Sequence, residues 1–452
     1  MLSCGKGVRE HLMVRRKRVL IPNREIGDTD HLVYAKLTTP HGVVRHVLCE
    51  VVLPKFKSKE PCFKFYPTEK QSDFLRHIWA FDLTATIRNA GRRITIRAEE
   101  VLSSGLATGV RDGIPFLNSF DGSPLSVERT FASARGRGKR IVKGTFDLTP
   151  CPVINAASII ERSHTGEVNV KRIVVPAFTL GSGLKLEFKK HFSTTEGKQK
   201  ESITTSHLVA EFEATKPLPH SQFPSAVEEF QEFLTLASFA SRYRCVCVRW
   251  GAVDERGSLT DHFQQNLVFP NARPPGPDET LIDLAYFFDF VVPSFSVYRG
   301  FTDRSYVNNA MFALIGERSI VNDRFLVYFT ALESLLLHAR HTSGRGKGDP
   351  KFKDLFDDFQ RAYSVDTSDL WPLLDRSKGR SLKDIRNRIA HGQPLNSREE
   401  YFLSFAADNL KWLVERMLLA IFKWPIQKSK VRKESLTYFT AHAWSNAITQ
   451  FR

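Results

Sequence analysis

The sequence predicts an α+β multidomain protein, with an N-terminal β-rich sandwich or barrel-like domain followed by a C-terminal all-α helical bundle. Two observations carry this prediction. Short stretches rich in β-branched residues fill the first 215 positions, and apolar residues recur at helical spacing from about residue 301 onward. A Pro-rich segment, Ala214–Pro224, lies between these regions. We therefore divide the chain into residues 1–215, a mixed and mainly helical connecting region at 216–300, and a helical domain at 301–452.

The N-terminal prediction rests on segments that partly alternate apolar and polar residues, as strands with one buried face do. Turns that contain Gly, Pro and Asn separate these segments, and this spacing favours a sandwich or an irregular barrel. The expected strands lie at His31–Thr38, Val43–Leu53, Arg93–Arg97, Arg172–Val175, Leu184–Phe188 and Leu208–Glu213.

Helical signals begin directly after the Pro-rich segment. Ser225 and Glu228 match a capping box, and apolar residues follow them at helical spacing. Farther along, Gly392 and Pro394 are typical of a helix end. Later helices are expected at Glu279–Phe290, from about Val321 to Arg340, at Lys353–Tyr363, from about Ser381 to His391, and from Ser397 to about Trp424.

Composition narrows the class of protein. A formal net charge of +16 favours polyanionic partners, nucleic acids among them. The 6 cysteines are too sparse for a disulfide scaffold, so we expect buried free thiols. We expect a cytoplasmic protein without a membrane partner, because no signal core or spanning segment is evident. No ligand spacing indicates a metal site, and we expect no cofactor.

The most informative segment for chemistry is Arg386–Gly392, at the expected end of a short helix. It combines a fixed cation for a phosphate, a polar amide at Asn387 and a histidine, His391, of a residue type that titrates near neutral pH. A histidine there could act as general base or acid on a 2′-hydroxyl, with arginine stabilising charge on the phosphate. The same residues could instead cap the helix end, and the pattern alone leaves both interpretations open.

Helix geometry bears on whether these groups meet. At about 100° per residue, Asn387, Arg388 and His391 project from one side, whereas Arg386 lies roughly 140° from His391. The motif therefore need not converge on itself within one chain. A two-fold dimer that joins two copies of this helix end would complete a composite site.

Arg386-Asn387-x-x-x-His391, followed by Gly392, resembles the R-N-x(3)-H signature of the HEPN superfamily. The upstream segment Arg324–Leu337, with Ala331-Leu332-Glu333-Ser334-Leu335 at its core, is similar to the ApeA-like HEPN group. The resemblance covers about residues 301–425. It implies a bundle of four or five helices that dimerises, and a metal-independent endoribonuclease of the kind found in toxin, abortive-infection and anti-phage defence systems.

On this resemblance Arg386, Asn387 and His391 form the catalytic set, with Asn387 in an orienting role. Arg388 has no fixed role in the family, and we expect it, with Lys383 and Arg380, to contact RNA phosphates. The implied reaction leaves a 2′,3′-cyclic phosphate and a 5′-hydroxyl. Structured RNA with exposed loops, such as tRNA, is a candidate substrate. Residues 1–215 would then sense or regulate the nuclease, with a phage-derived component as the trigger. The alternative is a non-catalytic module that binds RNA or a protein and uses the helical bundle for dimerisation.

Weaker candidates complete the sequence evidence. His338 and His341 have the spacing of a metal pair but no evident third ligand, which favours a surface pair. Glu333 could orient an arginine of the site or be an ordinary solvated carboxylate. The basic runs Arg15–Arg18 and Lys428–Lys433 could guide RNA or be solvated tails.

Overall fold

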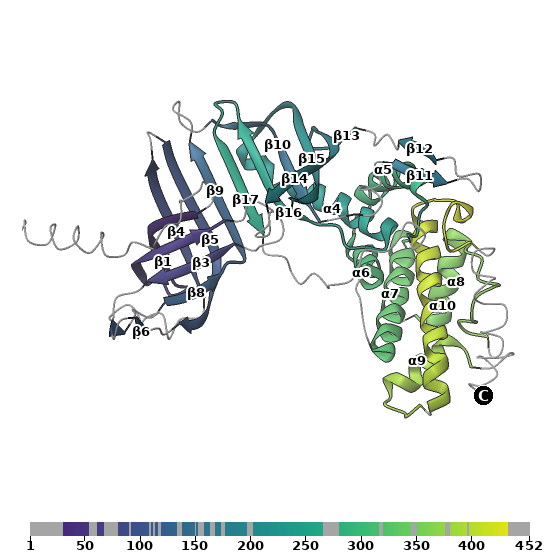
Figure 1. Cartoon of the computed structure of the whole chain (residues 1–452). Helices are drawn as coiled ribbons and strands as arrows, with labels where there is room; N and C mark the ends of the chain where they lie inside the picture. The colour runs from purple at the N-terminus through teal and green to yellow at the C-terminus, as the bar shows by residue number, and fades with distance from the viewer. Residues whose placement is uncertain are drawn as a thin grey trace, which may run out of the picture. The chain divides into compact units, whose positions relative to one another are not determined.

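The chain folds into two compact units in the computed structural model (Figure 1). The barrel unit comprises Met1–Phe131 with Phe263–Gln265, and the sheet–helix unit comprises Ala132–His262 with Asn266–Arg452. The structure describes residues 30–53, 61–66, 80–89, 92–107, 110–111, 114–115, 119–132, 138–149, 151, 158–162, 168–172, 177–196, 202–264, 280–315, 320–344, 350–375, 380–395 and 397–432.

Strands of the barrel unit pair in a closed ring, in the order β5-β4-β1-β2-β3-β8, and β8 pairs again with β5. All these pairings are antiparallel, and β9 is also hydrogen-bonded to β5. The β-rich character of the N-terminal region is confirmed, and the ring itself covers only the strands from Asp30 to Ser123. The strands are β1 Asp30–Thr38, β2 Val44–Val52, β3 Cys62–Tyr66, β4 Ala80–Asn89, β5 Arg92–Ala107, β8 Ser119–Ser123 and β9 Ser126–Ala132, and the short hairpin β6 Val110–Arg111 with β7 Ile114–Pro115 stands apart.

Closure of the ring depends on the length of β5. Its residues up to Leu102 pair with β4, and Leu102–Ala107 pair with β8. The register with β4 shifts opposite Phe81 and Leu83, and Glu100 there has a φ of 47°. Such an irregularity increases the local twist of a strand, which helps a sheet to curl into a barrel.

Alternate side chains of the ring fill its interior. Val33, Ala35 and Leu37 of β1 are buried, while the intervening Tyr34 and Lys36 are exposed. The rings of Phe65 and Phe81 meet edge to face with centroids 5.3 Å apart. Full burial of a side chain of this size contributes about 1.5–3 kcal/mol, so the alternation that predicts these strands also drives their closure.

In the sheet–helix unit the strands pair in the order β13-β14-β15-β10-β16-β17, as one part of a larger 13-stranded sheet. Strands β10 and β16 approach closely, because a Cβ atom on Gly144 would lie 2.0 Å from the carbonyl oxygen of Gly251. Any larger residue at Gly144 would therefore force the strands apart. The strands are β10 Arg140–Leu148, β13 Phe178–Thr179, β14 Leu184–Glu196, β15 Ser202–Pro219, β16 Cys247–Asp254 and β17 Leu259–Gln264, with a separate hairpin of β11 Ser158–Arg162 and β12 Val168–Arg172.

Helix α4 joins this sheet to the helical region. The ring of Phe230 stacks on Phe146 of β10 with centroids 4.3 Å apart, and Phe233 meets Phe295 of α5 edge to face at 5.7 Å. One apolar core therefore runs from the sheet through α4 into the helices. The α-helices of the described residues are α4 Phe223–Ser241, α5 Phe287–Arg299, α6 Ser305–Ile315, α7 Val321–Thr342, α8 Phe352–Tyr363, α9 Leu382–Ala390 and α10 Ser397–Ile421.

Several predicted boundaries differ from the observed ones. The boundary near residue 215 falls inside β15, and the compact units divide instead after Phe131. The helix predicted from Ser225 begins at Phe223, with Pro224 in its first turn and no side-chain cap. The helix expected at Glu279–Phe290 is α5, which starts at Phe287. The division after Phe131 follows from long-range packing, since strands that follow Phe131 share a core with the helices.

Two buried ion pairs fasten α10 to its surroundings. Arg242, the C-cap of α4, donates Nε–H and Nη2–H to the carboxylate of Glu415 at 2.7 and 2.6 Å. Arg416 forms a second two-pronged pair with Asp369 at 2.6 and 2.7 Å, and its Nε–H reaches the Val431 carbonyl. Charge-assisted pairs of this geometry are strong and orient the helix as well as stabilising it.

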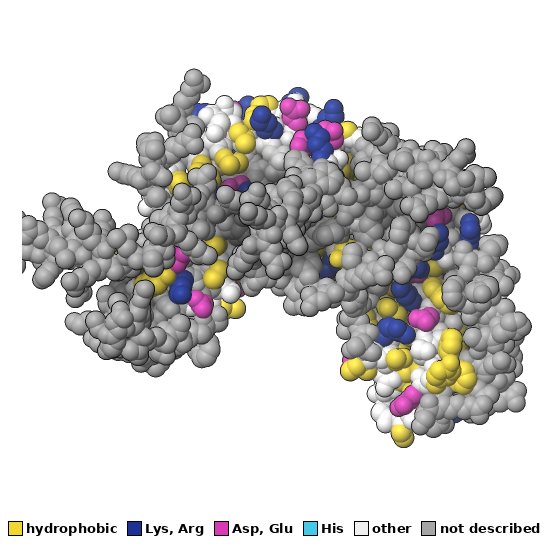
Figure 2. All heavy atoms as spheres, viewed as in Figure 1, with side chains coloured by type: hydrophobic (Ala, Val, Ile, Leu, Met, Phe, Trp, Pro, Cys, Tyr) yellow, Lys and Arg dark blue, Asp and Glu magenta, His cyan; other side chains and the backbone are white. Residues whose placement is uncertain are grey.

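The outward face of the sheet in the sheet–helix unit mixes charges of both signs. Lys185 lies opposite Glu213, and Lys189 pairs with Glu211 at 2.7 Å. Figure 2 shows these basic and acidic side chains intermingled over β10, β14 and β15. Such alternation typifies a solvated, salt-bridged surface rather than a site for a polyanion.

Two composition-based expectations can be compared with the described residues. The free thiols of Cys49, Cys151, Cys245 and Cys247 are buried, as predicted, whereas Cys62 is exposed on β3. None of the described helices combines the length and apolar character needed to cross a bilayer.

Candidate active site

The candidate site is built on α9, whose first turn is fixed by a capping box. The Ser381 hydroxyl accepts from the backbone N–H of Asp384, and the Asp384 carboxylate accepts from the backbone and hydroxyl of Ser381. Leu382 and Ile385 are buried and press one face of α9 into the core. The predicted helix from about Ser381 to His391 is therefore confirmed, with those two residues as its caps.

The other end of α9 closes in a Schellman motif. Gly392 has a φ of +66°, and its N–H donates to the carbonyl of Ile389, while the N–H of Gln393 donates to Arg388. This left-handed position favours glycine, as the sequence indicated. His391 is the C-cap residue, and its exposed side chain stands at the end of the helix. The motif thus presents the imidazole to solvent on a rigid backbone.

Arg386 is held in one orientation by contacts from two helices. Its Nη1–H donates to Asn387 Oδ1 at 3.2 Å, and Nη2–H donates to Glu333 Oε1 on α7 at 3.3 Å. The guanidinium also lies over the ring of Phe329, 5.6 Å from its centroid. The Arg386 side chain remains 36% exposed, so this oriented cation is accessible to an anionic ligand.

The helical-wheel expectation for these side chains is only partly met. It placed Asn387 with Arg388 and His391, away from Arg386. The long Arg386 side chain instead bends to the amide of its neighbour Asn387, and Arg388 turns toward the start of α10. Angles around a helix fix where a side chain leaves the backbone but not where a flexible stem ends.

Arg388 has the contacts of a structural residue. Its Nη1–H donates to the buried carboxylate of Glu399, and its Nη2–H donates to the Pro394 carbonyl at 2.8 Å. These contacts tie the end of α9 to the turn that follows and to the first turn of α10. Because Glu399 neutralises the guanidinium, these contacts favour the capping interpretation for this residue over a phosphate contact.

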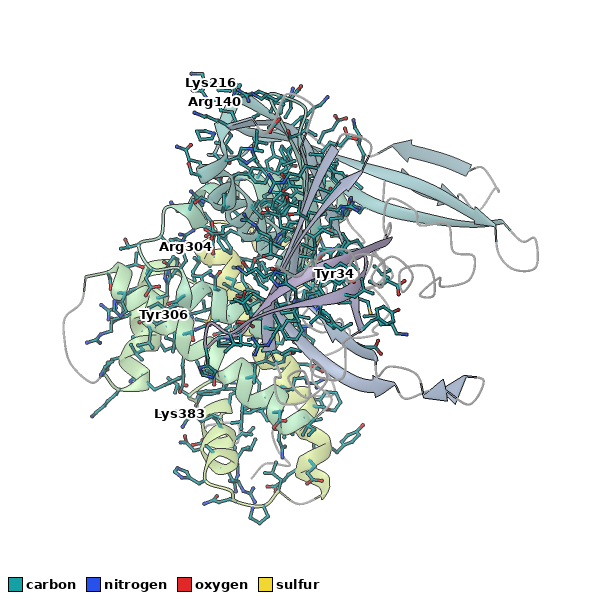
Figure 3. The ribbon with its side chains drawn as sticks, turned by 90° about the vertical axis from the view of Figure 1, so that its left-hand side faces the viewer. Tyr34, Arg140, Lys216, Arg304, Tyr306 and Lys383 are labelled. Atoms are coloured by element: carbon teal, nitrogen blue, oxygen red, sulfur yellow. The ribbon has the colours of Figure 1, made fainter. Side chains whose placement is uncertain are left out.

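Arg380 and Lys383 lie at the opposite end of α9 from His391. Lys383 is in the first turn, where its Nζ lies 5.5 Å from the centroid of the Phe352 ring, and it is labelled in Figure 3. The carbonyl of Arg380 accepts from the indole N–H of Trp371. A rise of 1.5 Å per residue places Lys383 about 12 Å along the axis from His391. These basic residues are not gathered around the histidine.

Phe329 and Glu399 are neighbours of the site that the sequence did not predict. Glu333, by contrast, was already a candidate to orient an arginine of the site. Phe329 and Glu333 are four residues apart on α7, so they share the face that meets α9. The four-residue spacing from Glu333 could therefore have indicated from the sequence that Phe329 lies beside the site. Glu399 had no such signal, because its role depends on how the turn after Gly392 folds back.

The His338–His341 pair does not form a metal site among the described residues, where no cluster of potential ligands is found. His338 is buried with its ring edge-on to Phe301, and burial lowers the pKa of its imidazole. His341 stacks on Tyr306 of α6 and shares a 3.1 Å hydrogen bond with its hydroxyl. The predicted surface pair is thus one exposed and one buried histidine.

The predicted basic runs have different outcomes. Arg15–Arg18 lies outside the described residues. In the C-terminal run, Lys430 pairs with Asp283 at 2.6 Å, and the Nζ of Lys428 lies 5.0 Å from the Tyr286 ring centroid. Val431 between these lysines and the chain end is fully buried. The described part of this run is therefore packed onto the unit and is not a solvated tail.

Comparison with known proteins adds no relative to this picture. No family model, no protein of curated function and no solved structure matches the chain.

Proposed function

We propose that this chain is a metal-independent endoribonuclease of HEPN type that acts in the cytoplasm in anti-phage defence. The observation that supports it best is that one short, rigid helix carries both an oriented, accessible arginine and an exposed histidine. The groups match the R-N-x(3)-H resemblance, and their chemistry suits RNA transesterification. The trigger that releases activity would be a phage-derived component that acts through the N-terminal region.

In the proposed reaction, His391 removes the proton of a 2′-hydroxyl, and the 2′-oxygen attacks the adjacent phosphorus. The bond from phosphorus to the 5′-oxygen breaks, and that oxygen takes a proton to become a 5′-hydroxyl. The other product is a 2′,3′-cyclic phosphate. Arg386 stabilises the charge on the non-bridging oxygens, and Asn387 helps to hold the guanidinium in place.

A second copy of the chain completes the proposed site. Arg386 and His391 are five residues apart, a rise of about 7.5 Å along the helix, and their side chains leave the backbone in different directions. Two copies of the α9 end related by a two-fold axis would place one histidine as base and the other as acid. Arg380 and Lys383 would then contact the RNA backbone farther from the reacting phosphate.

The direct test is to sequence RNA ends after induced expression, with and without phage infection, and to repeat cleavage with purified protein in EDTA. We expect new 5′-hydroxyl and 2′,3′-cyclic phosphate ends in structured RNA such as tRNA. Cleavage that EDTA abolishes would contradict the metal-free mechanism. Absence of new ends in infected and uninfected cells would instead favour the non-catalytic interaction module.

Glu333 provides a separate prediction, because it acts only through Arg386. Changing Glu333 to Gln removes the carboxylate charge that orients the guanidinium, and we expect kcat to fall roughly tenfold with KM little changed, as for interactions realised in the transition state. Stability should hardly change, since a half-exposed ion pair contributes about 0–1 kcal/mol. Steady-state cleavage and thermal unfolding of the two proteins measure both. A change in KM alone would assign Glu333 to substrate binding.

A further inference from the structure

One outward face of the barrel unit carries an exposed aromatic ring among basic side chains. Tyr34 and Lys36 leave β1 on the side opposite the buried Val33, Ala35 and Leu37. The Tyr34 side chain is 52% exposed, and Figure 3 labels it on its strand. A tyrosine as exposed as this contributes little to the core, so core packing does not account for an aromatic residue at this position.

Three basic residues and one threonine form a row across four strands beside this tyrosine. Lys36 of β1 lies opposite His46 of β2 on one side and Thr84 of β4 on the other, and Thr84 lies opposite Arg97 of β5. All four residues of the row are exposed. At the usual spacing between strands, the row spans about 14 Å.

Two acidic side chains near the row, Asp82 and Glu50, each accept a hydrogen bond. Asp82, two residues from Thr84 on β4, accepts from the backbone N–H of Glu100. Glu50 of β2 accepts from the hydroxyl of Tyr66 at 2.8 Å. Within the described residues, neither Lys36 nor Arg97 has a carboxylate within ion-pair distance. This face differs from the sheet of the other unit, where Lys185 lies opposite Glu213 and Lys189 pairs with Glu211.

We propose that this face of the barrel, formed by Tyr34, Lys36, His46, Thr84 and Arg97, binds single-stranded RNA. An exposed aromatic ring offers a stacking surface to any unpaired base, and neighbouring cations meet the phosphates that follow it. A duplex hides the faces of its bases, so the tyrosine selects the single-stranded form. The choice of RNA over other polyanions rests on the proposed function. The barrel then holds unpaired RNA for the helical unit to cleave.

The test separates binding from cleavage by using the full-length His391→Ala protein, which leaves RNA intact on the proposed mechanism. Fluorescence anisotropy with a labelled single-stranded RNA gives Kd over a series of salt concentrations. We expect Tyr34→Ala to weaken binding by about 5- to 150-fold without changing the salt dependence, since stacking carries no charge. Tyr34→Phe keeps the ring and should bind like the parent protein.

Charge variants give an independent measurement. Lys36→Gln and Arg97→Gln should each reduce the slope of log Kd against log salt by about 0.7, the value for one phosphate contact to a single strand. Lys143→Gln, at an exposed lysine opposite Glu213, makes the same charge change and should leave the slope unaltered. A fully paired hairpin of equal length should bind more weakly than the single strand.

The possible failures are distinguishable. The assignment of the barrel face is wrong if RNA binds but Tyr34→Ala and the two charge variants behave like the parent protein. It is also wrong if the paired hairpin binds as tightly as the single strand. Neither outcome affects the nuclease proposal. No binding of the single strand also overturns it and leaves the face to a protein partner. Binding that depends on Tyr34, with no cleavage by the protein that retains His391, would overturn the proposed function and keep this inference.

Discussion

Replacing His391 by alanine is expected to lower the rate of RNA cleavage by about 10²–10⁴-fold, the usual contribution of general acid–base catalysis. The residue is exposed at the C-cap of α9, where the backbone is held by hydrogen bonds that do not involve the imidazole. The variant should therefore fold like the parent protein. Single-turnover cleavage of a labelled RNA in EDTA measures the effect, and circular dichroism checks the fold.

The matched control is His341→Ala. His341 is also an exposed histidine near the end of a helix in the same unit, and its imidazole contacts Tyr306 rather than the candidate site. We expect its cleavage rate to stay close to that of the parent protein. Equal rates for the His391 variant and the parent protein would remove the central residue of the mechanism and favour the non-catalytic alternative.

Replacing Arg416 by methionine is expected to destabilise the sheet–helix unit by about 3–5 kcal/mol, the usual cost of breaking a buried ion pair from one side. The side chain of Arg416 is 2% exposed and makes two hydrogen bonds to Asp369, besides those to the carbonyls of Asp366 and Val431. Methionine fills much of the volume but leaves the Asp369 carboxylate and both carbonyls without this donor. Denaturant unfolding followed by fluorescence reports the loss, since the buried Trp371 lies two residues from Asp369.

Two further variants isolate the electrostatic part of this effect. Lys189→Met removes a cation from a surface pair in which Lys189, Glu187 and Glu211 are all at least 36% exposed, so it should change stability far less than Arg416→Met. Adding Asp369→Leu to Arg416→Met removes the unpaired carboxylate and should restore part of the lost stability. A double variant less stable than Arg416→Met alone would show that carbonyl contacts, not the buried charge, dominate the loss.

Local sequence signals predicted the elements of the helical region well. The predicted helices near Val321–Arg340, Lys353–Tyr363 and Ser381–His391 correspond to α7, α8 and α9 within a few residues. Their caps and apolar spacing are encoded within a few turns of chain. The division after Phe131 was missed, because it depends on strands paired across long stretches of sequence, and α5 starts later than expected, at Phe287.

The candidate site shows the same distinction at the level of side chains. Residue types at Arg386, Asn387 and His391 are enough to suggest an RNA-cleaving chemistry. They do not indicate that Arg386 pairs with Glu333 on another helix, or that Arg388 is neutralised by Glu399. Arginine stems are flexible, so their partners are decided by which carboxylates the packed helices bring within reach.

By itself, the sequence determined the chemistry available to this protein: a basic chain, a β-rich N-terminal region, and a short helix that is capped by Ser381 and ended by Gly392. These features follow from side-chain type and from hydrogen bonds between near neighbours. Only the tertiary structure decided that the first strands close into a ring, that Arg386 is oriented while Arg388 is structural, and that Tyr34 stands beside a row that contains Lys36 and Arg97. Each of these depends on contacts between residues distant in sequence, which no local pattern encodes.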